Sequence, residues 1–494
     1  MAKDQSIVDE AKVVKIQTSR SDMKPWLNFN DGATRMTFNT AVHGQALYFT
    51  PDLNIKPGYI KSWQWDMKER KYRLKLDTSL RFHDGRAITA KDFEFTLLKP
   101  FFTKLPTTNE TVTLSFIAGV KKINKGDKFK HGSVEGVKVI DNETIDIYLT
   151  SGHTRFLYSL GSLLAAFAPE DSFKEDYYTF KDTPIGAGPY KVEFNDPQSS
   201  MVRLKRIRGN GPEYLEFYSS KTAHTNKVDI ALGGGIYDMK AYSAENPNTY
   251  RMIEGALPNS IQVIVFNYQT EAAQNENFRR AVSLAIERWE NLPEFPNLKP
   301  TNQIIPSVSF GYNSHFKPVH DIAKAKEIFA KLPQSIKSRT HKLIAHGTPG
   351  TPPVSYYVAV RDALRAIGMK VELEVSEETR IADGDTSRTM VLFGRYVESN
   401  PLSSFGYYYP GVSNETLKSN PEYAALFDKA ENTESIEEVS KLIARLSEEI
   451  NKKSIVIPLH ERRPNYFLSN KISEVGVTDN AWALNVDNIK VKSK

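Results

Sequence analysis

The sequence predicts an α/β protein of two or three domains. Its 494 residues exceed the ~250–300 residues at which a single hydrophobic core stops growing. Apolar residues alternate with polar ones in several short segments, as in strands, and recur every three or four residues in others, as in helices. In the second half, a strand, a helix and a strand succeed one another over residues 343–375, which predicts a right-handed parallel crossover.

The first half of the chain contains the predicted hairpins. Residues 13–18 form the first strand, with Val14 and Ile16 on one face. Three β-hairpins follow, over residues 63–76, 137–149 and 190–204. Asp141 and Asn142 tolerate the left-handed backbone that a tight turn requires, so we expect the second hairpin to turn there.

The clearest predicted helices lie in the second half. One apolar stripe predicts a helix that packs on a sheet, and its members are Phe278, Ala281, Val282, Ala285, Ile286 and Trp289. Residues 354–367 form a helix closed by Gly368, between strands at residues 343–345 and 369–375. Ser435 opens another helix, over the apolar stripe of residues 436–450, and a strand follows at residues 455–459.

The composition argues against several classes of protein. The 65 Lys and Arg against 59 Asp and Glu leave a net charge of only +6, which disfavours nucleic-acid binding. The absence of cysteine excludes disulfides, thiolate metal sites and thiol nucleophiles, and it fits an exported protein. The longest apolar stretch, around residues 160–168, is far shorter than the ~20 residues that a transmembrane helix needs.

Catalytic motifs are missing from the sequence. It contains no GxxxxGK[ST], HExxH, GxSxG or EF-hand loop, so we expect neither an enzyme nor a cofactor. Residues 186–189 (Gly-Ala-Gly-Pro) indicate a turn before a strand, because Pro189 lacks a backbone donor. His341 and His346 lie on a strand and its exit, where they would not face one metal ion. We interpret the basic run of residues 203–208 as a solvated strand face; its members are Arg203, Lys205, Arg206 and Arg208.

Aromatic residues cluster in two neighbouring polar segments, residues 393–401 and 405–410. The first segment also carries Arg395 and Glu398, which could anchor opposite charges of a ligand. Tyrosine rings offer flat contact area at low entropy cost, so these segments suit the wall of a ligand cleft. A lobe edge that is simply covered by aromatic side chains would explain the pattern equally well.

Several sequence strings resemble the motifs of one known family. LRFHDGRAITAKDFEFTL at residues 80–97 comprises a strand end, a turn, and a helix that Thr89 caps and whose first turn holds Asp92. PIGAGPY at residues 184–190, VDIA at residues 228–231 and NFRRAV at residues 277–282 follow. In this order and spacing they resemble the family 5 extracellular solute-binding proteins, the peptide- and nickel-type receptors of ABC importers. The resemblance covers nearly the whole chain.

The resemblance implies an α/β, bilobal periplasmic-binding-protein fold, type II and cluster C-like, with an extra sublobe inserted in lobe I. Lobe I would comprise residues 1–46, 183–270 and 471–494, and the inserted sublobe residues 47–182. The second ligand-binding lobe would comprise residues 271–470. Residues 267–271 and the stretch near Ser469 are the expected hinges.

The family contacts its ligands from two segments, which correspond here to residues 26–35 and 395–409. The implied ligand-binding residues are Trp26, Asn30, Asp31, Arg35, Arg395, Tyr396, Glu398, Tyr407 and Tyr408. Peptide-binding members hold the peptide's α-ammonium group with an aspartate, and that position falls on Val397 or, shifted by one, on Glu398. Arg395 suggests that an anionic group enters instead, or that Arg395 pairs with Glu398 in the empty site.

The implied function is that of a receptor that captures a peptide or similar small polar solute between two lobes. It would deliver this ligand to a membrane ABC permease, as a monomer that binds no nucleic acid. We expect it in the periplasm or elsewhere outside the cytoplasm, with its signal peptide removed. A receptor for a sugar, an opine or a metal chelate is the alternative on the same fold, and an enzymatic, sensory or chaperone-like reuse is a further reading.

Overall fold

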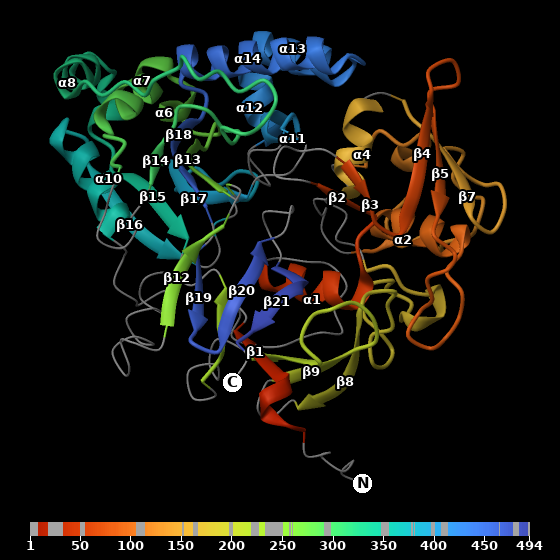
Figure 1. Cartoon of the computed structure of the whole chain (residues 1–494). Helices are drawn as coiled ribbons and strands as arrows, with labels where there is room; N and C mark the ends of the chain where they lie inside the picture. Colours follow the sequence, from red (N-terminus) through yellow and green to blue (C-terminus); the bar gives the residue numbers. More distant parts are fainter. Residues whose placement is uncertain are drawn as a thin grey trace. The chain divides into compact units, whose positions relative to one another are not determined.

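The computed structural model divides the chain into two compact units (Figure 1). Unit 1 comprises Met1–Leu257 and Pro464–Lys494, and unit 2 comprises Pro258–Arg463. The structure describes residues 8–17, 33–49, 55–104, 114–150, 153–161, 166–196, 201–218, 227–232, 250–255, 258, 260–290, 298–346, 355–376, 379, 381–396, 401–406, 413–463, 465–477 and 484–492. The predicted three-part domain organisation stays a prediction.

Unit 1 contains a seven-stranded mixed sheet. Its strands, in order across the sheet, are β12 (Tyr250–Glu254), β19 (Asn465–Ser469), β11 (Ile230–Leu232), β1 (Val13–Gln17), β10 (Tyr214–Tyr218), β9 (Met201–Arg206) and β8 (Tyr190–Asp196). The short 3₁₀ helix η1 (Glu10–Lys12) leads into β1. Strand β1 is parallel to β10 and β11, while β8 and β9 form the hairpin predicted over residues 190–204.

The larger of two hydrophobic clusters on this sheet contains most of its buried residues. Helix α1 (Ala33–His43) and the antiparallel pair β20 (Ile472–Val477) and β21 (Leu484–Val491) contribute to it. Val14 and Ile16 of β1 are fully buried in this core, together with Phe217 of β10. The apolar face that the sequence predicted for the first strand is therefore confirmed.

Residues 46–187 of unit 1 have a separate hydrophobic core. A four-stranded antiparallel sheet supports it, in the order β4 (Ile60–Asp66), β5 (Lys71–Leu76), β7 (Thr144–Tyr148) and β6 (Val137–Val139). Around this sheet lie α2 (Ala90–Phe102), α4 (His153–Gly161), the pair β2 (Leu47–Phe49) and β3 (Ile55–Pro57), and the 3₁₀ helices η2 (Val120–Lys122) and η3 (Glu170–Ser172). The hairpins predicted over residues 63–76 and 137–149 are confirmed.

The motif at residues 80–97 builds the start of α2. Thr89 is the N-cap residue, and its hydroxyl accepts the Asp92 backbone N–H at 3.4 Å. In return, the Asp92 carboxylate accepts the Thr89 backbone N–H at 2.8 Å and the Thr89 hydroxyl at 2.6 Å. This reciprocal capping box satisfies donors that the first helical turn leaves free, so the motif has the structural role that the sequence predicted.

The Gly-Ala-Gly-Pro segment before β8 packs directly on α1. A Cβ on Gly188 would lie 2.2 Å from the Ala41 carbonyl oxygen, and a Cβ on Gly186 would lie 2.0 Å from that of Val42. The Gly188 N–H donates to the Val42 carbonyl at 2.8 Å. The two glycines are therefore needed for a close approach of two backbones.

Unit 2 contains a six-stranded mixed sheet. Its order is β14 (Lys299–Pro300), β18 (Ile457–Arg462), β13 (Ser260–Phe266), β17 (Met390–Tyr396), β15 (His341–His346) and β16 (Val371–Ser376). The helices are α6 (Glu271–Gln274), α7 (Glu276–Ala285), α8 (Ile322–Ala330), α9 (Gln334–Lys337), α10 (Ser355–Ala366), α11 (Ser403–Gly406), α12 (Ser413–Ser419), α13 (Pro421–Glu431) and α14 (Ile436–Lys453). β15 and β16 are parallel and α10 connects them, as the strand–helix–strand pattern predicted.

Helix α7 is shorter than the apolar stripe predicted. It ends at Ala285, and the buried Ile286 already has an extended backbone. The Asp321 N–H bonds to the Leu284 carbonyl at 3.0 Å, and the Arg288 guanidinium donates to the Ser283 carbonyl at 2.7 Å. Because other groups satisfy these carbonyls, a further helical turn is not needed, and Trp289 lies outside the helix.

In the basic run on and after β9, only Lys205 matches the predicted solvated strand face, with a side chain that is 41% exposed, whereas the three arginines bond to the protein. Nε and Nη2 of Arg203 both donate to Oε1 of the buried Glu216, at 2.8 and 2.6 Å. Arg206 donates to the Gly211 carbonyl and Arg208 to the Ala187 carbonyl. Burial lowers the pKa of Arg208. These arginines hold unit 1 together, because their guanidinium groups satisfy carbonyls and a carboxylate that local structure leaves free.

The chain passes between the units after Leu257 and after Arg463. The expected hinge near residue 267 instead lies inside unit 2, where the buried Asn267 side chain donates to the backbone carbonyls of Asp385 and Arg388. The other expected hinge residue, Ser469, closes strand β19 inside unit 1. The sequence pattern did not reveal these crossings, because each directly adjoins a strand.

Candidate functional site

Most of the predicted ligand-binding side chains lie outside the described residues. This holds for Trp26, Asn30, Asp31, Glu398, Tyr407 and Tyr408. Of Arg35, Arg395 and Tyr396 the structure describes the backbone only: Arg35 belongs to α1, and the other two end β17. The structure does describe the strands that precede these segments in the chain, and the sheet edges at which those strands end.

In unit 1, the predicted segment at residues 26–35 follows the carboxyl end of β1. The parallel strands β10, β11 and β12 end at this same edge of the sheet, at Tyr218, Leu232 and Glu254. The chain leaves unit 1 shortly after Glu254, and it re-enters shortly before β19, which starts at this edge. In sheets of this kind, ligands bind beyond the carboxyl ends of parallel strands.

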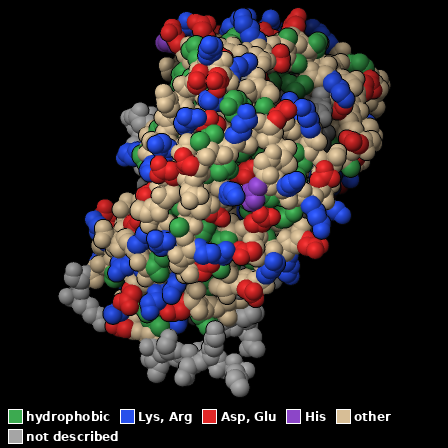
Figure 2. Space-filling model, turned by 90° about the vertical axis from the view of Figure 1, so that its right-hand side faces the viewer, with side chains coloured by type: hydrophobic (Ala, Val, Ile, Leu, Met, Phe, Trp, Pro, Cys, Tyr) green, Lys and Arg blue, Asp and Glu red, His purple; other side chains and the backbone are tan. Residues whose placement is uncertain are grey.

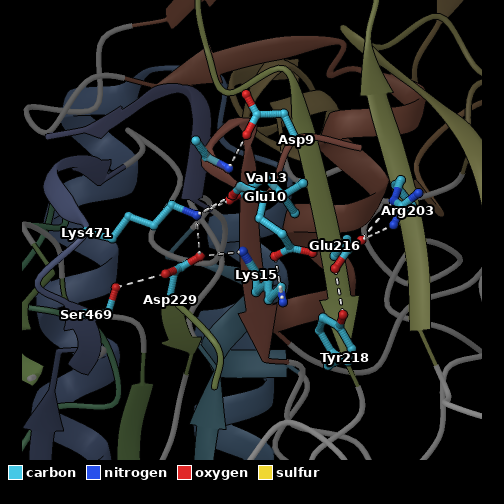
Figure 3. Close-up of polar contacts among 11 residues, drawn as sticks. Asp9, Glu10, Val13, Lys15, Arg203, Glu216, Tyr218, Asp229, Ser469 and Lys471 are labelled. Carbon is cyan, nitrogen blue, oxygen red and sulfur yellow. Dashed lines mark hydrogen bonds and ion pairs between the residues drawn. The ribbon is translucent and has the colours of Figure 1, made fainter. Parts of the chain in front are cut away.

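A buried charge network supports this edge (Figure 3). The Glu216 carboxylate accepts the Tyr218 hydroxyl at 2.6 Å as well as the Arg203 guanidinium. Burial, and secondarily the bond to Glu216, raises the pKa of Tyr218. Tyr218 therefore stays a neutral donor, and the network orients the last residue of β10.

In unit 2, the predicted segment at residues 395–409 begins at the carboxyl end of β17. The strands β15, β16 and β18 run in the same direction as β17 and end at the same edge. β13 is antiparallel to β17 and starts at this edge, where Ser260 pairs with Tyr396 and Ile261 with Arg395. The edge thus collects three strand ends around the predicted binding segment.

A cluster of aromatic, histidine and arginine side chains lies at this edge of unit 2. The Tyr356 hydroxyl, from the first turn of α10, lies 3.1 Å from Nδ1 of His460 on β18. The Trp289 ring is stacked on the His460 ring at a centroid distance of 6.4 Å and meets the Tyr356 ring edge-on at 6.0 Å. Neighbouring Tyr357 donates to the carbonyl of His346, the last residue of β15, at 3.1 Å.

The electrostatics of this cluster favour negative charge. Burial lowers the pKa of Arg288 to about 10, and no carboxylate of the described residues pairs with this guanidinium. Burial, together with the charges of Arg288 and Arg462, lowers the pKa of His460 to about 3, so the imidazole is neutral. Burial raises the pKa of Tyr356. The cluster therefore offers neutral hydrogen-bonding rings beside a desolvated cation.

The opposite edge of the unit 1 sheet carries a structural clamp (Figure 3). Asp229 precedes β11, and its carboxylate accepts the Lys15 backbone N–H at 3.0 Å and the Ser469 hydroxyl at 3.0 Å. Lys471 reaches the same carboxylate at 3.5 Å and also donates to the carbonyls of Glu10 and Val13. The aspartate of the VDIA motif therefore joins strands of the unit 1 sheet.

The rest of the described structure offers no stronger candidate for a ligand or metal site. Within the described ranges, no three His, Asp or Glu side chains are placed to hold a metal ion, and every helix is too short or too polar to span a bilayer. His341 is buried and contacts the Ile336 carbonyl at 3.0 Å. Acidic and basic side chains are interspersed on the face that Figure 2 shows. A cavity of about 890 Å³ in unit 1 is lined by both acids and bases, among them Arg86, Lys104, Asp127 and Glu170.

Comparison with known proteins identifies the family. Residues 54–419 match the family model described as the middle region of bacterial extracellular solute-binding proteins, family 5. The chain belongs to this family.

Among its curated relatives is the dipeptide-binding protein DppE of Bacillus subtilis, which is 22% identical over 475 residues and is matched over 87% of this chain and 84% of its own. The solved structures show the same fold. The periplasmic binding protein DppA of Helicobacter pylori, in complex with peptide STSA, has a TM-score of 0.76 at 16% identity over 97% of this chain and 98% of that chain. NikA of Brucella suis, in complex with Fe(III)-EDTA, has a TM-score of 0.77 at 16% identity over 97% and 100%.

Membership of family 5 confirms three predictions from the sequence. The fold is the α/β bilobal periplasmic-binding-protein fold. The chain is a solute-binding protein of an extracellular family that serves ABC transport. The family is non-catalytic, in agreement with the expectation that the chain is not an enzyme.

Sequence reasoning missed the cluster of Arg288, Trp289, Tyr356 and His460. The predicted apolar stripe of a core helix includes Trp289, and His460 directly follows the predicted strand at residues 455–459. The sequence carries little signal for this cluster, since Tyr356 and Trp289 fall within predicted helices and only His460 stands just beyond a predicted strand. Their meeting depends on the order of strands β18, β13, β17 and β15, which the sequence pattern does not specify.

Proposed function

We propose that this solute-binding protein captures a peptide or similar small polar solute outside the cytoplasm and delivers it to an ABC permease. The family match supports the receptor role, and the name of the relative DppE supports a peptide. The peptide in the structure of Helicobacter pylori DppA points in the same direction. No chemical change of the ligand is required in this role.

The ligand residues in this proposal come from the carboxyl edges of the two sheets. Residues 26–35 follow β1 at one edge, and residues 395–409 begin at the end of β17 at the other. In each unit, the two points where the chain passes to the other unit also lie at or near the carboxyl edge of the sheet. Strands β1 and β17, which precede these two segments in the chain, both end at the carboxyl edges of their sheets, and this supports the segments as binding segments.

The single observation that carries the proposal is the cluster at the edge of unit 2. Arg288, whose guanidinium donates to the carbonyls of Ser283 and Ile286, contributes a positive charge, and the Tyr356–His460 pair contributes neutral hydrogen-bonding groups beside the Trp289 ring. A small polar solute that carries an anionic group matches this combination. A free peptide carboxylate is one such group.

A metal chelate, an opine or a sugar is the second candidate. The comparable similarity to NikA in complex with Fe(III)-EDTA favours a polyanionic chelate, since its carboxylates would also suit Arg288. The Trp289 and Tyr356 rings would suit a sugar ring.

Ligand that stays bound through purification tests the proposal. The protein would be purified under native conditions and denatured, and the released small molecules identified by mass spectrometry. We expect peptides or another anionic polar solute in stoichiometric amounts. When the released compound is incubated for a long time with fresh protein, it should be recovered chemically unchanged. An Arg288→Met preparation serves as the comparison and should release less of the same compound. Products that accumulate in proportion to protein concentration would contradict the receptor role.

A further inference from the structure

The side-chain amide of Gln262 on β13 has no partner in the described part of the chain. Its residue is only 7% exposed, and its side chain forms no hydrogen bond to any residue that the structure describes. This amide does not belong to the fully buried polar atoms that lack a partner, so water or a ligand can reach it. A polar group in a largely buried residue normally has a hydrogen-bond partner, which here must come from outside the described residues.

A second buried glutamine of unit 2 shows the usual arrangement. Gln303 is fully buried, and its amide donates to the Asn313 carbonyl at 2.7 Å and accepts the Asn313 N–H at 3.0 Å. Both ends of that amide are therefore satisfied by the protein. Gln262 has the same donor and acceptor, and neither end is bonded to a residue that the structure describes.

Gly394 provides the space for the Gln262 amide. The two residues are directly opposite each other on β13 and β17. A Cβ on Gly394 would lie 2.7 Å from Nε2 of Gln262, closer than van der Waals contact allows. The amide thus occupies the place that a side chain at position 394 would fill.

The neighbours of Gln262 belong to the candidate site. His460 lies opposite Gln262 on the other side of β13, and cross-strand partners share a face of the sheet. Ser260, two residues nearer the edge on the same face, is 6% exposed, and its hydroxyl also has no partner in the described part of the chain. Two unpaired polar groups therefore line up from the edge of the sheet toward the Tyr356–His460 pair.

We propose that Gln262, with Ser260 beside it, hydrogen-bonds an amide group of the ligand, and that Gly394 determines this specificity by leaving room for the Gln262 side chain. This inference rests on the proposed receptor function and narrows its ligand to molecules that contain an amide, such as peptides. A primary amide can accept from and donate to a peptide group at once. A carboxylate or a metal chelate would accept hydrogen bonds from the N–H groups of the Gln262 amide and would leave its carbonyl oxygen unused.

The test combines stability with binding. Gln262→Met keeps the size of the side chain and removes only the unpaired polar group, so the melting temperature of the ligand-free protein should stay the same or rise. Gln303→Met is the matched control, and its melting temperature should fall because two backbone partners lose their bonds. A fall for Gln262→Met as large as that for Gln303→Met would show that Gln262 is structural and overturn the inference.

Binding is measured with a pool of short peptides from a casein digest, and the retained peptides are identified by mass spectrometry. For one retained peptide, we expect Gln262→Met to weaken binding roughly 5- to 150-fold, the range for a buried group left unpaired. Gly394→Ala should weaken it similarly, and it should add little in the Gln262→Met background, since both changes remove the same contact. Unchanged affinity in Gln262→Met would overturn the inference while leaving the receptor function intact.

Ester analogues of that peptide test the ligand group itself. Replacing one backbone amide by an ester removes its N–H donor, and one such replacement should weaken binding to the unaltered protein but not to Gln262→Met. Equal losses in both proteins at every position would contradict amide recognition. If the unaltered protein retains no peptide from the pool but releases another solute after native purification, the amide inference is wrong and the receptor role stands.

Discussion

The Asp229 carboxylate accepts a hydrogen bond from the Ser469 hydroxyl at 3.0 Å, although the two residues lie 240 positions apart in the sequence. The same carboxylate holds the backbone N–H of Lys15, and the backbone N–H of Ser469 donates to the Asp229 carbonyl at 2.8 Å. One aspartate therefore joins β1, β11 and β19, which come from the beginning, the middle and the end of the chain. This junction adds to the pairing of β19 with β11 and β12 in holding the returning C-terminal segment in unit 1.

Replacing Asp229 should destabilise unit 1. Asp229→Ala leaves the Lys15 N–H and the Ser469 hydroxyl without their acceptor, so we expect a loss of about 1–3 kcal/mol in the free energy of unfolding. Chemical unfolding followed by tryptophan fluorescence measures it. Asp182→Ala, at an exposed position of the same unit, is the control and should change little. Equal stability of both variants would mean that the clamp contributes nothing.

The capping box of α2 gives a second stability prediction. Thr89→Ala removes the hydroxyl that accepts the Asp92 N–H and should cost about 0.5–2 kcal/mol. Thr89→Ser retains the hydroxyl and is the matched control. Thermal unfolding should therefore order the proteins as parent, Thr89→Ser, Thr89→Ala. A Thr89→Ser variant as unstable as Thr89→Ala would place the effect in the methyl group and not in the cap.

Acidification should destabilise the protein through its buried histidines. Burial lowers the pKa of His460 to about 3 and that of His83 to about 4, below the ordinary value of 6.5. Between these values the unfolded chain binds protons that the folded protein does not, so stability is complete above the ordinary value and falls as the pH drops below it.

The histidine contribution can be isolated with one variant. Between about pH 7.5 and about pH 5, we expect His460 to account for about 1–2 kcal/mol of the lost unfolding free energy. His460→Gln should show a pH dependence that is smaller by this amount. His320→Gln, at an exposed position, is the control. An identical pH dependence in His460→Gln and the parent would contradict a buried neutral imidazole.

The charged residues predicted from the family resemblance can be tested once a ligand is known. If Arg395 and Glu398 anchor opposite charges of the ligand, each alanine variant should lose ~2–5 kcal/mol of binding free energy, or roughly thirty- to several-thousand-fold in affinity. If the two residues lie on the surface without contacting the ligand, each alanine substitution should reduce the binding free energy by at most ~1 kcal/mol. Calorimetric titration distinguishes the two ranges, with the thermal stability of the ligand-free variants measured alongside. Affinities within about fivefold of the parent for both variants would place the site elsewhere.

Local patterns determined which segments fold into which element. The alternation in residues 137–149 and the stripe in residues 436–450 appear in the structure as β6, β7 and α14 because strand and helix periods depend only on neighbours in the sequence. The Thr89–Asp92 capping box spans three residues, so it too could be predicted. Motif order was enough to identify the family, and with it the class of fold.

Tertiary structure alone decided where these elements meet. The end of α7 at Ala285 depends on Asp321 and Arg288, which take up carbonyls that a longer helix would have used itself. The role of Arg203 depends on Glu216 in the next strand, and the unpaired amide of Gln262 depends on a glycine more than a hundred residues away. The sequence by itself determined periodic local structure and family membership. The partners of its buried polar groups are distant in the chain, and only the pairing of strands brings them within hydrogen-bonding distance.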